Sequence, residues 1–105
     1  MAQFDIYKNS NRLSKKEIPY LMDIQSDSVS VLDTRIVVPL RNAELFKKRA
    51  VSRIHISIEV NEVKFIAFVS EMAAVPTGMI DKPISNKADK HTEIIGAIDL
   101  LFTGF

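Results

Sequence analysis

Residues 53–70, RIHISIEVNEVKFIAFVS, decide the predicted fold of this chain. From residue 54 to residue 60 an isoleucine or valine alternates with a polar residue, which is the period of a strand with one buried face. Asn61 and Glu62 then form a two-residue turn, because Asn tolerates the positive φ angle that a tight hairpin requires. Residues 63–70 are largely apolar on both faces, as in a central strand. The stretch therefore predicts a hairpin within an antiparallel sheet.

Further strand patterns lie on both sides of this hairpin. They are residues 4–7, residues 20–25 after Pro19, residues 35–40, whose pairing Pro39 is expected to end, and residues 72–75, which Pro76 stops. Asn42 is placed to cap one or two helical turns that end at Lys47. The basic run at 47–49 is expected to be the solvated edge of these turns.

The segment from His91 to Phe105, HTEIIGAIDLLFTGF, has the period of an amphipathic helix. Its apolar stripe contains Ile94, Ile98, Leu101 and Phe105, and the opposite, weakly polar stripe contains Thr92, Gly96, Asp99 and Thr103. Ser85 or Asn86 is expected to cap this helix, and Gly104 lets the chain turn after it. Two interpretations of Phe105 remain open: the ring packs back on the protein, or it is offered to a partner.

Together these patterns predict about six short strands and one helix at the end of the chain. This order is typical of a mainly β fold, namely a strongly bent antiparallel sheet or partly open barrel with a helix packed against it. With 105 residues and no internal repeat, the chain is expected to form one domain, residues 1–105.

The composition narrows the class of protein. The chain contains no cysteine, so disulfides and cysteine zinc sites are excluded, and a cytoplasmic location is expected. No apolar run approaches the ~18 residues of a membrane span, and residues 1–7 do not resemble a signal peptide, so no membrane contact is expected. Residues 1–53 hold ten Lys and Arg against six Asp and Glu, whereas residues 54–105 hold four against seven. This asymmetry favours a charged partner surface over general nucleic-acid binding.

Two polar segments are candidate binding surfaces. Residues 8–17, KNSNRLSKKE, form a basic loop that is either a solvated hairpin connection or a docking site for an acidic segment. Asp23, Gln25 and Asp27 are spaced by two, so an extended chain places them on one face. No second ligand cluster or nearby histidine accompanies them, so the spacing favours a hydrogen-bonding surface over a metal or acid–base site.

Residues for catalysis are sparse. His55 is expected on the wet face of a strand and His91 near a helix start, and both are interpreted as surface histidines. A metal-independent ribonuclease would combine His55 with Asp23 or Asp27 and use Arg35 to stabilise an anion, but nothing in the spacing favours this arrangement. No catalytic residue, metal site or cofactor is predicted.

Six short pieces of the sequence, taken in order, resemble the CcdB family of bacterial toxins. They are Gln3-Phe4-x-x-Tyr7, Asp23-x-Gln25-Ser26-Asp27, Arg35-x-Val37-x-Pro39-Leu40, His55-Ile56, Met72-Ala73-x-Val75-Pro76 and Ala97-Ile98-x-Leu100-x-Phe102-x-Gly104. The resemblance implies an SH3-like barrel with a C-terminal helix, and a homodimeric toxin of a toxin–antitoxin module. It also implies that the toxin is not itself an enzyme: it binds the GyrA subunit of DNA gyrase and traps gyrase on cleaved DNA. The toxin is expected to bind DNA only as part of its complex with a CcdA-like antitoxin.

Carried over by position, the resemblance implies two sets of contacts. The gyrase contacts fall at Asp99, Phe102, Thr103, Gly104 and Phe105, with Ser26, Ser28 and Val29 nearby. An acidic, disordered segment of the antitoxin is expected at Asp23, Gln25, Ser26 and Asp27 and at Arg12, Lys15 and Lys16 of the basic loop. The terminal helix is more apolar than a one-sided surface helix in so small a domain requires, so Leu101 and Phe102 are expected near the two-fold axis of the dimer.

The chain departs from the family pattern within the expected gyrase surface. The family's best-known member has Asn where Asp99 stands, Trp where Thr103 stands, Ile at the final position, and Ile-Ile-Asp in place of Ser28-Val29-Ser30. A Trp would supply a stacking surface for an arginine of gyrase, which Thr103 does not. Two alternatives to a gyrase-poisoning toxin stay open. One is an endoribonuclease toxin, since the same barrel also carries toxins that cleave messenger RNA, and the other is a non-toxic relative that only binds its antitoxin.

Overall fold

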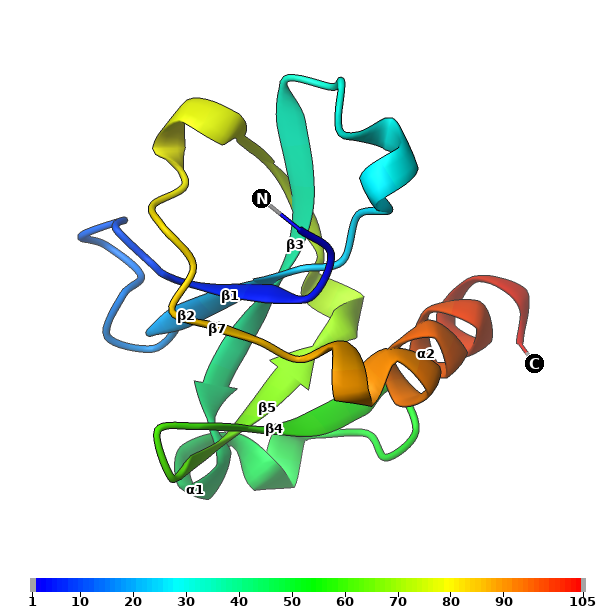
Figure 1. Ribbon diagram of the computed structural model, residues 1–105. Coiled ribbons are helices and arrows are strands. Elements are labelled where there is room, and N and C mark those ends of the chain that lie inside the picture. The colour runs from blue at the N-terminus through cyan, green and yellow to red at the C-terminus, as the bar shows by residue number, and fades with distance from the viewer. Residues whose placement is uncertain (1, 105) are drawn as a thin grey trace.

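The computed structural model describes residues 2–104, in which seven strands form a curled antiparallel sheet (Figure 1). The strands are β1 (Asp5–Lys8), β2 (Tyr20–Asp23), β3 (Thr34–Asn42), β4 (His55–Val60), β5 (Val63–Phe68), β6 (Ala73–Pro76) and β7 (Ser85–Asn86). Their order is β4-β5-β3-β2-β1-β7, and β6 pairs with β3. A short helix α1 (Ala43–Phe46) follows β3, and α2 (His91–Thr103) is the last element of the described residues. The predicted mainly β fold, an SH3-like partly open barrel with a C-terminal helix, is confirmed.

β4 and β5 form the predicted hairpin. Asn61 and Glu62 have φ angles of 51° and 68° and connect Val60 to its partner Val63. Positive φ at both central residues is the type I′ turn, whose twist matches that of the flanking strands. Along β4 the side chains alternate between the core and the solvent. β5 lies between β4 and β3 and is buried over its last four residues, as expected of a central strand.

β3 is longer than the sequence indicates, because Pro39 does not end its pairing. Pro39 pairs with Leu21 of β2, and the strand continues to Asn42. On the other edge of β3 the partner changes from β6, up to Val37, to β5, from Leu40 onward. Pro39 lies at this change of partner, where its missing N–H interrupts no ladder hydrogen bond. The expectation was wrong because the sequence does not reveal which neighbour each edge of a strand has.

The hydrophobic core lies between the curled sheet and α2. It is built from aliphatic and aromatic residues of β1 to β5, and α2 adds Ile94 and Ala97, which are buried. α2 packs against β4 and against the turn that follows β5 (Figure 1). Ile98 and Leu101 are partly buried against the same cluster. The predicted apolar stripe of the helix is therefore the face that packs, while Thr92, Gly96, Asp99 and Thr103 are exposed.

The expected cap of α2 is only partly correct. Ser85 and Asn86 form β7, which pairs with β1, and a 3-10 turn at Ala88–Lys90 separates β7 from the helix. The Asn86 side chain caps that turn by accepting a hydrogen bond from the Ala88 N–H at 2.9 Å. Lys90 stands at the N-cap of α2 and makes no side-chain cap. In the described part of the chain, no helix has the length and apolar character needed to cross a bilayer.

Candidate functional site

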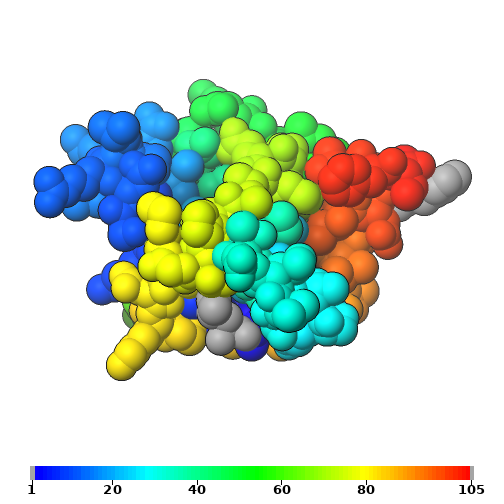
Figure 2. Space-filling view, turned by 90° about the horizontal axis from the view of Figure 1, so that it is seen from above, coloured from blue at the N-terminus to red at the C-terminus, as the bar shows by residue number. Residues whose placement is uncertain are grey.

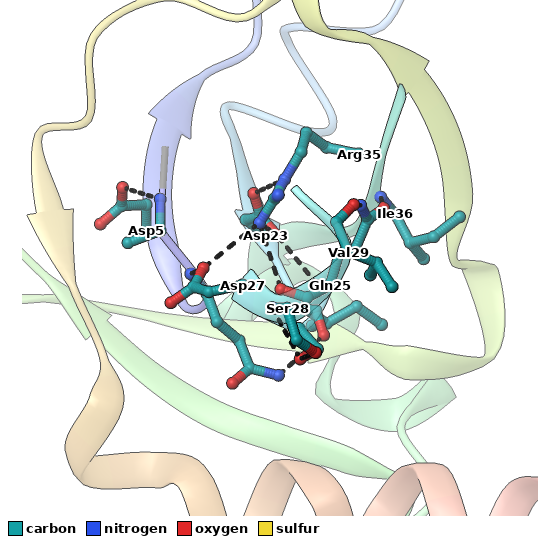
Figure 3. Close-up of polar contacts among 12 residues, drawn as sticks. Asp5, Asp23, Gln25, Asp27, Ser28, Val29, Arg35 and Ile36 are labelled. Atoms are coloured by element: carbon teal, nitrogen blue, oxygen red, sulfur yellow. Dashed lines mark hydrogen bonds and ion pairs between the residues drawn. The ribbon is translucent and has the colours of Figure 1, made fainter. Parts of the chain in front are cut away.

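A buried ion pair between Arg35 and Asp23 lies at the base of the turn that follows β2 (Figure 3). Nε of Arg35 donates to Oδ2 of Asp23 at 2.6 Å, and Nη2 donates to Oδ1 at 3.0 Å. Arg35 is 1% exposed and Asp23 0%. The hydrogen bond to Asp23 raises the pKa of the Arg35 guanidinium. The pair is neutral as a unit, and loss of either partner would leave the other charge buried and unpaired.

Gln25 connects this ion pair to the turn. Its N–H donates to Oδ1 of Asp23 at 2.9 Å, and its carbonyl accepts from Nη2 of Arg35 at 3.1 Å. Its side-chain amide donates to the Val29 carbonyl and accepts from the Ile36 N–H, both at 3.0 Å. Gln25 is buried, and its hydrogen bonds to Val29 and Ile36 join the two ends of the connection between β2 and β3 from inside the protein.

The turn presents Ser26, Asp27 and Ser28 at the surface. The Ser26 hydroxyl accepts from the Ser28 N–H at 3.2 Å. Oδ1 of Asp27 accepts from the Gln3 N–H at 2.8 Å and lies 3.7 Å from Nη2 of Arg35. The conformation of the turn is thus set by groups of the core and of the chain start as well as by its own serines.

A second polar cluster surrounds Asp5, which joins β1, β7 and the chain start. Its carboxylate accepts from the Ala2 N–H at 2.8 Å, the Asn86 amide at 2.9 Å and the Tyr7 hydroxyl at 3.3 Å. Burial raises the pKa of the Tyr7 phenol, and the carboxylates of Asp5 and Asp23 add to the rise. Tyr7 is therefore held neutral over a wider pH range than a free tyrosine.

The residues expected to contact an antitoxin do not form one surface. Asp23 and Gln25 lie inside the protein, so their side chains do not reach a partner in this conformation. Ser26 and Asp27 are exposed on the turn. The basic loop, whose arginine and lysine residues are exposed, lies at the opposite end of the molecule from α2 (Figure 2). Binding of an antitoxin to any of these residues stays a prediction.

The end of α2 carries the residues expected to contact gyrase. Asp99, Phe102 and Thr103 are exposed, and Phe102 is 69% exposed. The Thr103 hydroxyl donates to the Asp99 carbonyl at 2.6 Å. Gly104 has φ 79° and ψ 13°, the left-handed conformation in which many helices end and which glycine adopts without strain. Phe105 lies outside the described residues, so both interpretations of its ring remain open.

The turn after β2 and the end of α2 lie on the same side of the molecule (Figure 2). Both expose large apolar side chains, namely Val29, Val31 and Leu32 on the turn segment and Phe102 on the helix. Leu101, expected at a dimer axis, is partly buried against the core, whereas Phe102 points away from it. Two segments far apart in sequence therefore contribute exposed apolar area to one side of the protein, and self-association there stays a prediction.

His55 makes its contacts outside the hydrogen-bond network of Asp23 and Arg35. Its Nδ1 accepts from the Val51 N–H at 2.8 Å, its Nε2 lies 2.9 Å from the Ser70 hydroxyl, and its ring stacks on Phe68 with centroids 4.3 Å apart. Burial lowers the pKa of this imidazole. The network around Asp23 contains no histidine among its hydrogen-bond partners in residues 2–104. Among the described residues, His55 and Asp23 are therefore not hydrogen-bonded to each other.

Sequence reasoning did not identify the pairing of Asp23 with Arg35. The sequence signal was a charged residue at the start or end of each of two apolar strand patterns, since charges at buried positions are almost always paired. Finding it would have required the knowledge that β2 and β3 are neighbours. Among the described residues, no group of three His, Asp or Glu is arranged to hold a metal ion.

The antiparallel sheet is curled, and the C-terminal helix α2 packs against it. This arrangement is the SH3-like barrel that was expected from the sequence. The family model described as CcdB protein matches residues 3–104 of the chain. Because the match covers nearly the whole chain, the protein belongs to the CcdB family. This membership makes it a toxin of the toxin–antitoxin class.

Proposed function

We propose that the protein binds the GyrA subunit of DNA gyrase and traps the enzyme on cleaved DNA, without being an enzyme itself. Membership of the CcdB family supports this function. The observation that carries the proposal is the end of α2, where Phe102 is 69% exposed shortly before the left-handed Gly104. An aromatic ring presented on a rigid helix is the type of anchor that dominates binding energy in protein interfaces.

The turn after β2 supports the same surface from a second segment. Ser26, Ser28 and Val29 are exposed on the side of the molecule where α2 ends (Figure 2). The buried Arg35–Asp23 pair and Gln25 hold this turn in place, so its contribution to binding is preorganised and costs less conformational entropy. With Thr103 where the family's best-known member has Trp, Phe102 is the exposed aromatic residue that the described part of α2 presents.

We further propose that a cognate antitoxin neutralises the protein in the cytoplasm and that the active form is a homodimer. The exposed apolar side chains of Phe102 and Leu32 support self-association, because large exposed apolar side chains gathered on one side of a protein are typical of an interaction surface. The exposed basic loop supports the recruitment of an acidic antitoxin segment.

The proposal is tested by incubating the purified protein with gyrase and supercoiled plasmid, and separately with messenger RNA. Accumulation of linear, gyrase-linked DNA with intact RNA is the expected result. RNA cleavage without gyrase trapping would identify the endoribonuclease rival. Absence of both activities, with antitoxin binding retained, would identify the protein as a non-toxic relative.

A further inference from the structure

His55 is the first residue of β4 and closes the turn that leads into this strand. Its backbone N–H donates to the Val51 carbonyl at 2.9 Å, and the Val51 N–H donates to Nδ1 of its imidazole ring at 2.8 Å. The ring stacks on Phe68 of β5, with the two centroids 4.3 Å apart and the planes inclined by 24°. Val51 and His55 therefore exchange two hydrogen bonds, and the bond to the ring depends on the protonation state of the imidazole.

The turn of residues 51–55 depends on these hydrogen bonds. The side chains of Val51 and Arg53 are exposed, so they bury little apolar area. Arg53 has a φ angle of 76°, a left-handed conformation that a residue with a side chain adopts only at a cost in free energy. Besides the two bonds to His55, the Ile54 N–H donates to the Val51 carbonyl at 3.2 Å. A strained and exposed turn persists only where its contacts outweigh the strain, so loss of the bond to the ring weakens the closed form.

Only the neutral imidazole can accept the hydrogen bond from Val51. Nδ1 accepts through its lone pair, so it carries no proton, and the proton of the neutral ring lies on Nε2. Nε2 then donates to the hydroxyl oxygen of Ser70, 2.9 Å away. In the imidazolium both ring nitrogens carry a proton, and the Nδ1–H would face the Val51 N–H. Protonation of His55 therefore replaces an attractive contact by a repulsive one.

The groups around the imidazole favour its neutral form. Burial lowers the pKa of His55, and the Glu71 carboxylate opposes this effect. Glu71 is already engaged, since its Oε1 accepts from Nε of Arg41 at 2.9 Å. The hollow between β4 and α2, which His55 lines, contains one further group of each sign, namely Arg53 and Glu93. The charges around His55 thus largely balance, and burial decides.

The segment between α1 and β4 is strongly basic. Residues 47–54, KKRAVSRI, contain four Lys and Arg and no Asp or Glu. The segment leads from the end of α1 to β4 and passes beside α2 (Figure 1). A proton on His55 adds a further positive charge next to this segment. Electrostatic repulsion therefore acts in the same direction as the loss of the hydrogen bond.

We propose that His55 is a proton-sensitive latch for the turn of residues 51–55. The neutral imidazole holds the turn through the Val51 N–H, and a proton on Nδ1 releases it. Release frees the basic segment, residues 47–54, from the sheet and withdraws Arg53 from the hollow that it lines against α2. The latch lies at the start of β4 and uses none of the residues proposed to contact gyrase.

The latch is expected to open as the pH falls below the ordinary histidine pKa of 6.5. Above pH 6.5 the ring is neutral whether the turn is open or closed, and the latch is fully effective. Below pH 6.5 the open turn takes up a proton that the closed turn excludes, until the lowered pKa of the closed form is reached. Within this window the population of the open turn is expected to rise by up to about tenfold per pH unit.

Hydrogen exchange and ¹⁵N NMR of the labelled protein test the latch. At pH 7.5 the chemical shifts of the ring nitrogens are expected to show a proton on Nε2 and none on Nδ1. Between pH 7.5 and pH 5 the protection factor of the Val51 amide, corrected for the intrinsic exchange rate, is expected to fall at least about threefold. The Ala67 amide in the central strand β5 serves as the control for global unfolding and is expected to keep a higher protection factor.

Three variants separate the ring nitrogen from the ring itself. In His55→Asn the side-chain oxygen takes the place of Nδ1 as an acceptor that does not titrate, so the Val51 amide is expected to stay protected at both pH values. His55→Phe keeps an aromatic ring on Phe68 but offers no acceptor, so protection is expected to be low at both. His91→Gln replaces the other histidine of the chain and is expected to keep the pH dependence of the wild type.

A smaller fall in the protection of the Val51 amide would overturn the proposal, as would a proton on Nδ1 at pH 7.5. Equal loss of protection at Val51 and Ala67 would assign the pH dependence to the whole protein and would also exclude a local latch. If His55→Phe fails to fold, the wild-type titration together with that of His91→Gln decides the question.

Discussion

Arg35 and Asp23 lie on neighbouring strands and meet through two hydrogen bonds of 2.6 and 3.0 Å in the interior of the protein. Through Gln25, this pair determines the position of the turn that carries Ser26 and Ser28. A surface proposed to bind a partner is thus supported by a buried charge pair. The stability of the protein and the geometry of this surface are therefore coupled.

Replacing one member of the pair is expected to destabilise the protein strongly. Arg35→Met leaves the Asp23 carboxylate buried without a positively charged partner, and the free energy of unfolding is expected to fall by about 3–5 kcal/mol. Urea unfolding measures this loss, with Lys48→Met as an exposed control. The double variant Asp23→Leu with Arg35→Met is expected to recover part of the loss, since no unpaired charge remains. A loss below about 1 kcal/mol for the single variant would contradict this account.

Tyr7 is expected to make the protein sensitive to alkaline pH. Its pKa is raised in the folded state above the ordinary tyrosine value of 10.0, mainly by burial. Below pH 10 the phenol is neutral in both the folded and unfolded states, and the full stability is present. Above pH 10 only the unfolded state ionises, so the free energy of unfolding is expected to fall by about 1.4 kcal/mol per pH unit until the folded pKa is reached. Unfolding measured between pH 8 and pH 11 should show this slope in the wild type and lose it in Tyr7→Phe.

Deleting residues 103–105 is expected to separate folding from gyrase trapping. Thr103 and Gly104 are exposed, and their hydrogen bonds close only the last turn of α2. The truncated chain is expected to lose at most about 1 kcal/mol, or less than about 8 °C in Tm, and to bind antitoxin but not trap gyrase. Calorimetry and the trapping assay check both parts. Trapping by the truncated chain would move the active surface elsewhere, and unfolding would favour a packed Phe105.

The predicted dimer is expected to depend on Phe102. Because this ring is exposed in the single chain, Phe102→Glu should leave the fold intact while placing a charge in the interface. Sedimentation at micromolar concentration is expected to show a dimer for the wild type and a monomer for the variant. Leu13→Glu, the same kind of change at a residue 97% exposed on the basic loop, is expected to remain dimeric. A folded wild-type monomer at this concentration would refute the prediction.

The basic loop is expected to control how fast an antitoxin associates. Replacing Arg12, Lys15 and Lys16 by Ser should lower the association rate and flatten its dependence on salt, because the electrostatic attraction is removed. Gyrase trapping should be largely unchanged. Replacing the exposed run 47–49 by Ser removes the same charge elsewhere and serves as the matched control. Stopped-flow kinetics at low salt that show equal rates for the two triple variants would exclude the loop from the interface.

Local patterns in the sequence determined much of the fold. The alternation in residues 54–60, the Asn61-Glu62 turn and the period of the terminal helix were all correctly predicted. Each is a property of residues close together in the chain, where side-chain direction follows from the backbone period. The helical period also predicted the stripe opposite the apolar one, Thr92, Gly96, Asp99 and Thr103, which is exposed. The gyrase contacts at the end of α2 came from the resemblance to the CcdB family and stay a prediction.

Only the tertiary structure decided which residues from distant segments meet. Pro39 continues a strand because its neighbours change at that position, and Asn86 pairs with β1 before it caps a turn. Asp23 became part of the core because β3 brings Arg35 beside it. Arg41 meets Glu71 and Glu17, which approach it from separate segments of the chain. Such contacts depend on which strands are neighbours and on burial. Burial lowers the local dielectric constant, so the interaction between two charges is stronger inside the protein than at its surface.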